Sequence, residues 1–130
     1  MHAAVQVLVD FVEKEHPDKV VDWNADEALM HAWEEIQSLY KWWKETRPAR
    51  RSPLDDGAES GGVIPPLELR RVPGSDVCEM VEPDKYAIGW REYAEYYRAL
   101  DEDFRLEEQW YEEDQCNLHR LIEIRGYLWT

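Results

Sequence analysis

The chain has 130 residues, and its 29 acidic and 15 basic residues give a formal net charge of −14. With 34% charged and 44% hydrophobic residues it has the composition of a globular chain, so we expect one soluble domain over residues 1–130. Phosphate backbones and anionic lipids repel so acidic a surface, which disfavours binding to nucleic acid or membranes and favours basic proteins or metal cations as partners.

The first predicted element is a helix over residues 3–16. Its apolar residues recur at helical spacing, namely Val5, Leu8, Val9 and Val12. Pro17 ends the pattern, because proline cannot continue a helix. The run is also rich in β-branched residues, which favour extended chain, so a strand remains an alternative.

A second helix is predicted over residues 25–46. Asn24 followed by Glu27 resembles a capping box at its start, and Pro48 ends it. Its apolar seam has a period of about 3.5 residues and consists of Leu29, Trp33, Ile36, Tyr40 and Trp43.

Residues 48–75 hold four of the six glycines and five of the seven prolines. Such a composition is typical of a flexible linker or a long loop between helices. Within it, residues 63–72 have the sequence of a short extended piece. We therefore expect a crossover loop that leaves the flanking helices near-antiparallel or crossing at a shallow angle.

A long helical stretch is predicted from about residue 83 nearly to the end, with Gly126 as its stop. Its main apolar seam comprises Tyr93, Tyr97, Leu100, Phe104, Tyr111, Leu118 and Ile122. A neighbouring strip comprises Leu106, Trp110, Leu121, Ile124 and Leu128. The stretch is either one helix of about ten turns or two helices that meet near residues 101–103. We expect its main seam to face the seam of the second helix.

Residues 101–114 contain eight acids and one arginine. At 100° per residue, Asp103, Glu107 and Asp114 lie between the two apolar strips and point toward the predicted core. A buried carboxylate is costly unless it is paired. We therefore expect Glu107 and Asp114 to be buried charges that meet Arg47 or another base. The alternative is that the helix bends and leaves these acids solvated.

Other residues are candidates for contact with a partner protein. Asp101, Glu108 and Glu112 form an outward acidic stripe on the long helix. Trp42 and Met30 lie off the apolar arc of the second helix, where they would be exposed. Both would instead be covered if the N-terminal element packed against that side.

A metal site has weak candidates in His31, Glu35, Glu107 and Asp114. His31 and Glu35 are four residues apart on one helix face. The acid-dense helices also resemble all-α nucleotide pyrophosphohydrolases, whose EExxE runs hold magnesium. The segment EEIQS at residues 34–38 starts that pattern and departs from it at the last position. A metal-dependent nucleotide hydrolase with Mg²⁺ as cofactor is therefore an alternative, beside a protein with no cofactor or catalytic residues.

A nucleic-acid mimic is another alternative. Eight acids over fourteen helical residues, about 21 Å, approach the linear charge density of a DNA strand, which carries one phosphate per about 3.4 Å. Such a surface would occupy a basic groove on another protein, although its acids are spread over three stripes.

The cysteines, Cys78 and Cys116, form no CxxC pair or metal-type spacing. The N-terminus lacks a basic region followed by a long apolar run, so it predicts neither a signal peptide nor a membrane span. We expect a cytoplasmic protein with free thiols.

Two segments carry a resemblance, WEEIQSLYKWWKETRPAR at residues 33–50 and WYEEDQCNLHRLIEIRGYLWT at residues 110–130. They resemble uncharacterised small acidic proteins of tailed bacteriophages. The resemblance implies a phage gene product in the cytoplasm of a bacterial host and carries no catalytic role. Small acidic phage proteins often bind and inhibit a host protein, so the resemblance also favours a chain that binds a host protein.

Together these patterns predict an all-α fold, a small helical bundle with one long C-terminal helical region and a long Pro/Gly-rich crossover loop. The leading function is non-catalytic binding of another protein through an acidic and aromatic surface, with a basic protein as the candidate partner. Spare apolar surface makes a homo-oligomer an alternative.

Overall fold

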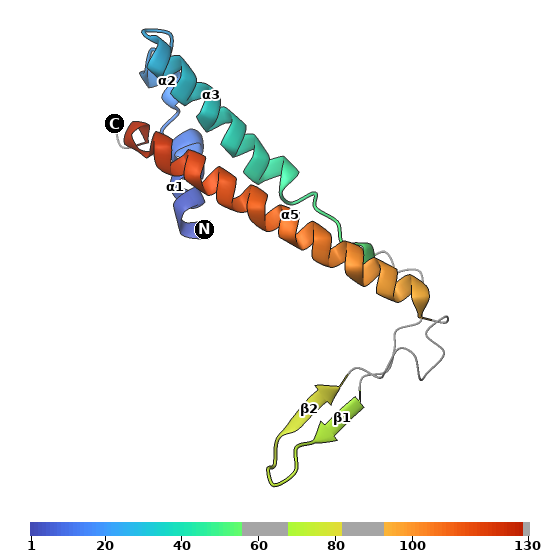
Figure 1. The fold of residues 1–130 in the computed structure, drawn as a ribbon. Helices are drawn as coiled ribbons and strands as arrows, with labels where there is room; N and C mark the ends of the chain where they lie inside the picture. Colours follow the sequence, from blue (N-terminus) through green and yellow to red (C-terminus); the bar gives the residue numbers. More distant parts are fainter. Residues whose placement is uncertain (56–67, 82–92, 129–130) are drawn as a thin grey trace. The chain divides into compact units, whose positions relative to one another are not determined.

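A computed structural model describes residues 1–55, 68–81 and 93–128 (Figure 1). The chain is mostly helical, as predicted, with one small two-stranded sheet. It divides into two compact units. The first comprises Met1–Arg50 and Gln109–Thr130, and the second comprises Arg51–Glu108. The expectation of a single domain stays a prediction, and the two units are described separately.

The N-terminal element is a helix, α1, over His2–Lys14, which settles the choice between helix and strand. It buries one apolar face, made by Val5, Leu8, Val9 and Phe11. The chain turns at His16, which has a left-handed backbone with φ of 47°, into the short helix α2 over Pro17–Val20. Burial of this face outweighs the modest β preference of its valines.

The second helix, α3, covers Glu27–Lys41. Its N-cap is Asp26, whose carboxylate accepts a hydrogen bond from Leu29 N at 2.8 Å. The prediction of Asn24 as the cap was wrong, because Asp26 holds the extended backbone that an N-cap needs. The helix continues as a π-helical turn, η1, over Trp42–Thr46, so the end predicted at residue 46 is confirmed.

The C-terminal region forms one continuous helix, α5, over Ala94–Ile124. The alternative of two helices meeting near residues 101–103 was therefore wrong. A 3₁₀ turn, η2, over Arg125–Tyr127 contains the predicted stop Gly126, and Leu128 beyond it is buried. The part of the predicted helical stretch at residues 83–92 lies outside the described residues.

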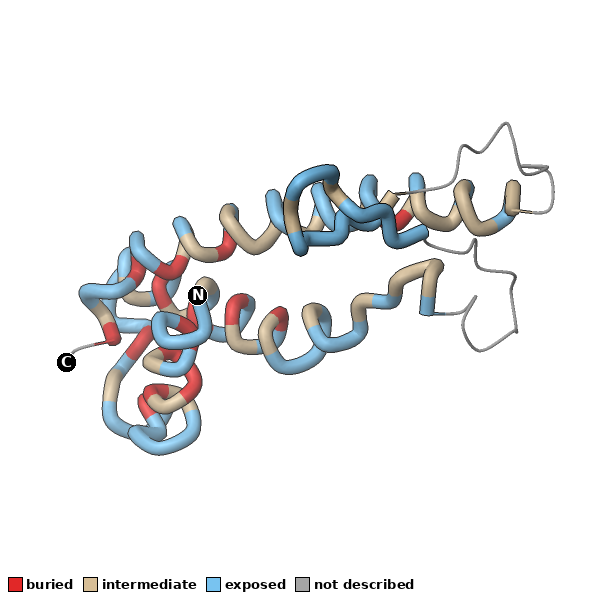
Figure 2. Tube along the Cα trace, turned by 90° about the horizontal axis from the view of Figure 1, so that it is seen from below, coloured by how far each residue is buried: buried red, intermediate tan, exposed pale blue. Residues whose placement is uncertain are grey.

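In the first unit α3 runs antiparallel to the C-terminal half of α5, as expected. Glu35 contacts Arg120, and the later residue Arg47 contacts the earlier residue Asp114. The buried residues gather where α1, α3 and the end of α5 meet (Figure 2). The core consists of Val5, Leu8, Val9, Phe11, Trp23, Ala32, Ile36, Leu39, Leu121, Ile124 and Leu128.

The second unit contains an antiparallel hairpin of β1, Glu68–Arg71, and β2, Cys78–Val81. Its turn places Gly74 at φ of 78°, a left-handed conformation that suits glycine. The hairpin accounts for part of the extended piece expected at residues 63–72, and residues 56–67 lie outside the described part. In the same unit the Ser52 hydroxyl donates to buried Asp103.

Candidate functional site

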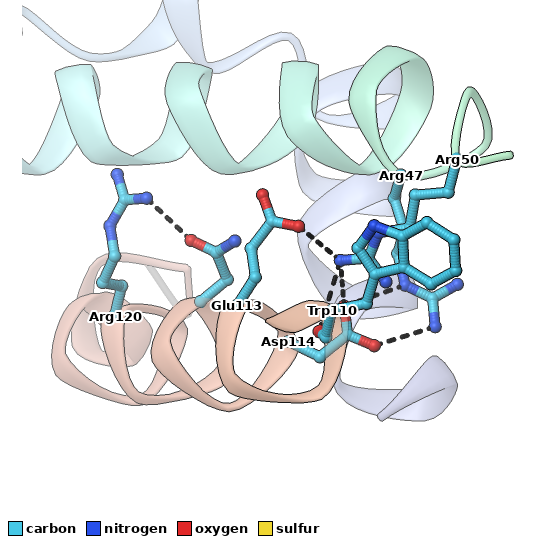
Figure 3. Close-up of polar contacts among 7 residues, drawn as sticks. Arg47, Arg50, Trp110, Glu113, Asp114 and Arg120 are labelled. Atoms are coloured by element: carbon cyan, nitrogen blue, oxygen red, sulfur yellow. Dashed lines mark hydrogen bonds and ion pairs between the residues drawn. The ribbon is translucent and has the colours of Figure 1, made fainter. Parts of the chain in front are cut away.

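A cluster of charged residues joins the end of α3 to α5 in the first unit (Figure 3). Arg47 donates two hydrogen bonds to the Asp114 carboxylate, from Nε to Oδ1 at 3.2 Å and from Nη2 to Oδ2 at 3.0 Å. Arg50 Nη2 donates to Asp114 Oδ1 at 2.8 Å and to Glu113 Oε2 at 2.5 Å. We call Arg47, Arg50, Glu113 and Asp114 the arginine–carboxylate clamp.

Tryptophan rings surround the two arginines of the clamp. The Arg47 guanidinium carbon lies 5.0 Å from the centroid of the Trp43 ring. That of Arg50 lies 5.9 Å from the Trp42 ring and 5.7 Å from the Trp110 ring. Aromatic faces attract cations at such distances. The rings therefore stabilise the guanidinium groups and limit the access of water to them.

The hydrogen bonds of the clamp favour the charged forms of Asp114 and Arg50. Burial alone would raise the pKa of Asp114, but hydrogen bonds from Arg47 and Arg50 outweigh it and hold the pKa below its ordinary value. Burial likewise opposes the charge of Arg50, while bonds to Asp114 and Glu113 raise its pKa. Asp114 and Arg50 therefore stay charged at neutral pH, and the cluster works as a structural tie between α5 and the chain that follows α3.

A second tie lies about two turns further along α5. Arg120 Nε donates to Glu35 Oε2 at 2.7 Å, and its other nitrogens reach Ser38 Oγ at 3.0 Å and Asn117 Oδ1 at 2.8 Å. The hydrogen bond from Arg120 lowers the pKa of Glu35. Burial opposes this shift, and the attraction between the two charges adds to it. This tie fixes the register of the two helices at a second point.

The hypothesis of inward acids is confirmed for Asp114, which meets Arg47 as expected. It was wrong for Glu107, which is exposed. Glu107 and Asp114 are seven residues apart and therefore point in nearly the same direction on α5. The two acids differ in their level along the helix, because Arg47 and Arg50 bind Asp114 within the first unit, whereas Glu107 belongs to the second.

The four metal candidates do not form a site within the described residues. Glu35 is bound to Arg120 and Asp114 to two arginines, while His31 and Glu107 are exposed. In residues 1–55, 68–81 and 93–128, no group of three or more His, Cys, Asp or Glu side chains is placed to hold a metal ion.

The partner-binding candidates divide into two groups. The prediction of Trp42 as an exposed contact was wrong, because its side chain is buried and lines a small space together with Val5 of α1 and Leu121 of α5. Met30 is exposed. The acidic candidates on α5 are also exposed, namely Asp101, Glu108 and Glu112.

The predicted main seam of α5 does not face α3. Phe104 is 60% exposed, Tyr111 is 65% exposed and Ile122 is 45% exposed. The prediction that this seam lies in the core was wrong, since α1 and α3 together cover the neighbouring strip instead. The spacing of apolar residues located both strips of α5, but it did not determine which strip α1 and α3 cover. We call Tyr111, Gln115, Leu118 and Ile122 the α5 outer face.

Sequence reasoning also missed Arg50 and Arg120. Arg50 follows Pro48, outside the predicted helix, so a helical wheel did not place it. The signal for Arg120 was its position three residues after Asn117, which is buried, on α5.

Comparison of the chain with protein-family models, with curated proteins and with solved structures finds no match. Among the described helices, none has the length and apolar character needed to cross a membrane.

Proposed function

We propose that this protein is a non-catalytic binding protein that captures a basic partner protein through the α5 outer face and the acids beside it. The observation that carries the proposal is the exposure of Tyr111 and Ile122 on a helix whose adjacent strip already fills the core. Contiguous apolar surface rimmed by polar residues marks interaction sites on proteins.

The acids beside this face select the charge of the partner. Glu112 is exposed and follows Tyr111 directly, and Glu108 is exposed one turn earlier on α5. Within the described residues neither carboxylate has an ion-pair partner. With a net charge of −14 on the chain, lysine and arginine residues on a partner are the complementary groups.

The resemblance to small acidic phage proteins supports a bacterial host protein as the partner and the cytoplasm of the host as the place of binding. The positions of the arginine ties support a rigid presentation of the face. Arg47 and Arg50 bind carboxylates of α5, and Arg120 of α5 binds Glu35 of α3, so the helix is held at two levels by groups other than those of the α5 outer face. A preorganised surface loses less entropy when it binds.

The test compares capture of host proteins by the wild-type chain and by the double variant Tyr111→Ser with Ile122→Ser. The proposal expects a basic protein that binds the wild type and loses at least about tenfold in affinity, about 1.4 kcal/mol, with the double variant. Val20→Ser is the matched control, because Val20 is 77% exposed on α2 and is not part of the α5 outer face.

A second arm replaces Glu108 and Glu112 with glutamine and measures the affinity at several salt concentrations. Loss of affinity together with a weaker salt dependence is the expected result. Equal binding by the wild type and both double variants would refute the proposal. Competition by duplex DNA for the captured protein would indicate the nucleic-acid mimic instead.

A further inference from the structure

We infer that the element of the partner that occupies the α5 outer face is an amphipathic α-helix with basic residues along one edge. This inference rests on the proposed function and specifies the structure of the bound segment. It follows from the spacing of Tyr111, Leu118 and Ile122, which we call the anchors, from the backbone hydrogen bonding of α5, and from the side of the helix on which the acids lie.

The anchors repeat along one straight line. Tyr111 and Leu118 are seven residues apart, and Ile122 follows four residues later within the continuous helix Ala94–Ile124. Eleven residues correspond to about three turns, so Tyr111 and Ile122 point within about 20° of each other and lie about 17 Å apart along the axis. Seven-and-four spacing is the pattern of seams between packed helices.

The surroundings of the anchors differ from one position to the next. Leu118 is half-buried and lines a small space beside α1 with Val5 and Leu8, so α1 borders the face on that side. Gln115 is half-buried between Tyr111 and Leu118 and supplies a side-chain amide that donates and accepts. A partner side chain therefore meets apolar surface with one polar position near its centre.

Backbone hydrogen bonding favours a helix over a strand as the occupant. The amides and carbonyls in the middle of α5 bond within the helix, so the face offers no free edge on which a strand pairs. An extended segment on an apolar helix surface would bury unpaired backbone groups, each of which costs free energy. A helix satisfies its own backbone and presents side chains at the spacing of the anchors.

The acids set the charge pattern of that helix. Glu112 is exposed on the flank away from α1, and Glu108 is exposed four residues earlier on the same helix, so the complementary lysines or arginines lie along one edge of the bound helix. A second copy of this chain is a poor occupant. Both copies would bring the same acidic edge to the seam, and each carries a net charge of −14.

The test uses two synthetic peptides of about 18 residues, both made of the same numbers of leucines and lysines. One repeats leucine with a helical period, and the other alternates leucine with lysine as in a strand. Binding to the full chain is measured by titration. The contact surface is mapped from backbone amide shifts, and helix gain from circular dichroism.

The inference expects the helical-period peptide to bind at least about tenfold more tightly than the alternating peptide, to gain helix on binding, and to shift residues 111–122. The variant Tyr111→Ser with Ile122→Ser should remove this preference, and Val20→Ser should keep it. A dimer of the chain alone that the double-serine variant dissociates would make a second copy the occupant and overturn the inference.

The two proposals fail in different ways. Equal affinities, or a preference for the alternating peptide, with shifts still at residues 111–122 would overturn the helical occupant and leave the proposed function standing. Binding that maps elsewhere and is unchanged by the double-serine variant would overturn both.

Discussion

Asp114 on α5 accepts a hydrogen bond from Arg50 at 2.8 Å, although the two residues lie 64 positions apart in the chain. Asp114 also accepts two bonds from Arg47, and its side chain is only 15% exposed. Replacing Asp114 with asparagine would leave Arg47 without its counter-charge and Arg50 with Glu113 alone. We expect a loss of about 1–3 kcal/mol in the free energy of unfolding, measured by urea denaturation.

Glu107→Gln is the matched control for this change. Glu107 lies on the same helix and is exposed, so its neutral variant should change stability by less than about 0.5 kcal/mol. If the two variants lost the same stability, the clamp would not contribute as the distances imply.

Adjacent residues on α5 provide a second prediction. Leu121 is 5% exposed in the core, and Ile122 is 45% exposed on the α5 outer face. Leu121→Ala should destabilise the fold by about 2–5 kcal/mol because it leaves a cavity. Ile122→Ala should cost less than about 1 kcal/mol, since it removes little buried surface. Thermal unfolding followed by circular dichroism gives both values, and a reversed order would mean that the main seam faces the core after all.

The N-cap at the start of α3 provides a third prediction. The Asp26 carboxylate caps the helix through Leu29 N, whereas the Asn24 side chain makes no such bond. Asp26→Ala should therefore cost about 0.5–2 kcal/mol. Asn24→Ala should have a smaller effect in the same denaturation experiment, and the opposite ranking would restore the cap expected from the sequence.

The Glu35–Arg120 ion pair makes stability depend on pH. The hydrogen bond from Arg120 holds the pKa of Glu35 below its ordinary 4.5 in the folded chain. A lowered pKa means that the pair contributes its full stabilisation above the unfolded value and loses it as the pH falls through the folded value. The stability difference between the wild type and Glu35→Gln should therefore be large at neutral pH and shrink below about pH 4.5.

Urea midpoints measured from neutral pH to about pH 3 test this dependence. Glu34→Gln serves as the control, because Glu34 is the exposed neighbour of Glu35 on α3. Its difference from the wild type should stay nearly constant with pH. A constant difference for Glu35→Gln as well would show that the pair does not persist in solution.

The sequence predicted the helices well because apolar residues at helical spacing depend on local geometry alone. It also predicted that Asp114 meets Arg47, since both point along the inner sides of their helices. It failed on the cap, where Asn24 and Asp26 are chemically equivalent choices and the backbone decides between them. It failed on Tyr111 for a different reason. Two apolar strips on one helix look alike until the positions of α1 and α3 determine which strip is covered.

The π-helical turn over Trp42–Thr46 has a consequence for how this chain can change in evolution. The Arg47 amide bonds to Trp42 O at 2.8 Å, so this turn holds one residue more than an α-helical turn. The turn absorbs its extra residue locally, so deleting one residue here would restore a regular α-helical turn and leave Arg47 and Arg50 facing nearly the same way. Elsewhere in α3 the same deletion would rotate everything after it by about 100°. The segment Trp42–Thr46 should therefore accept the loss of a single codon more readily than the rest of α3 does.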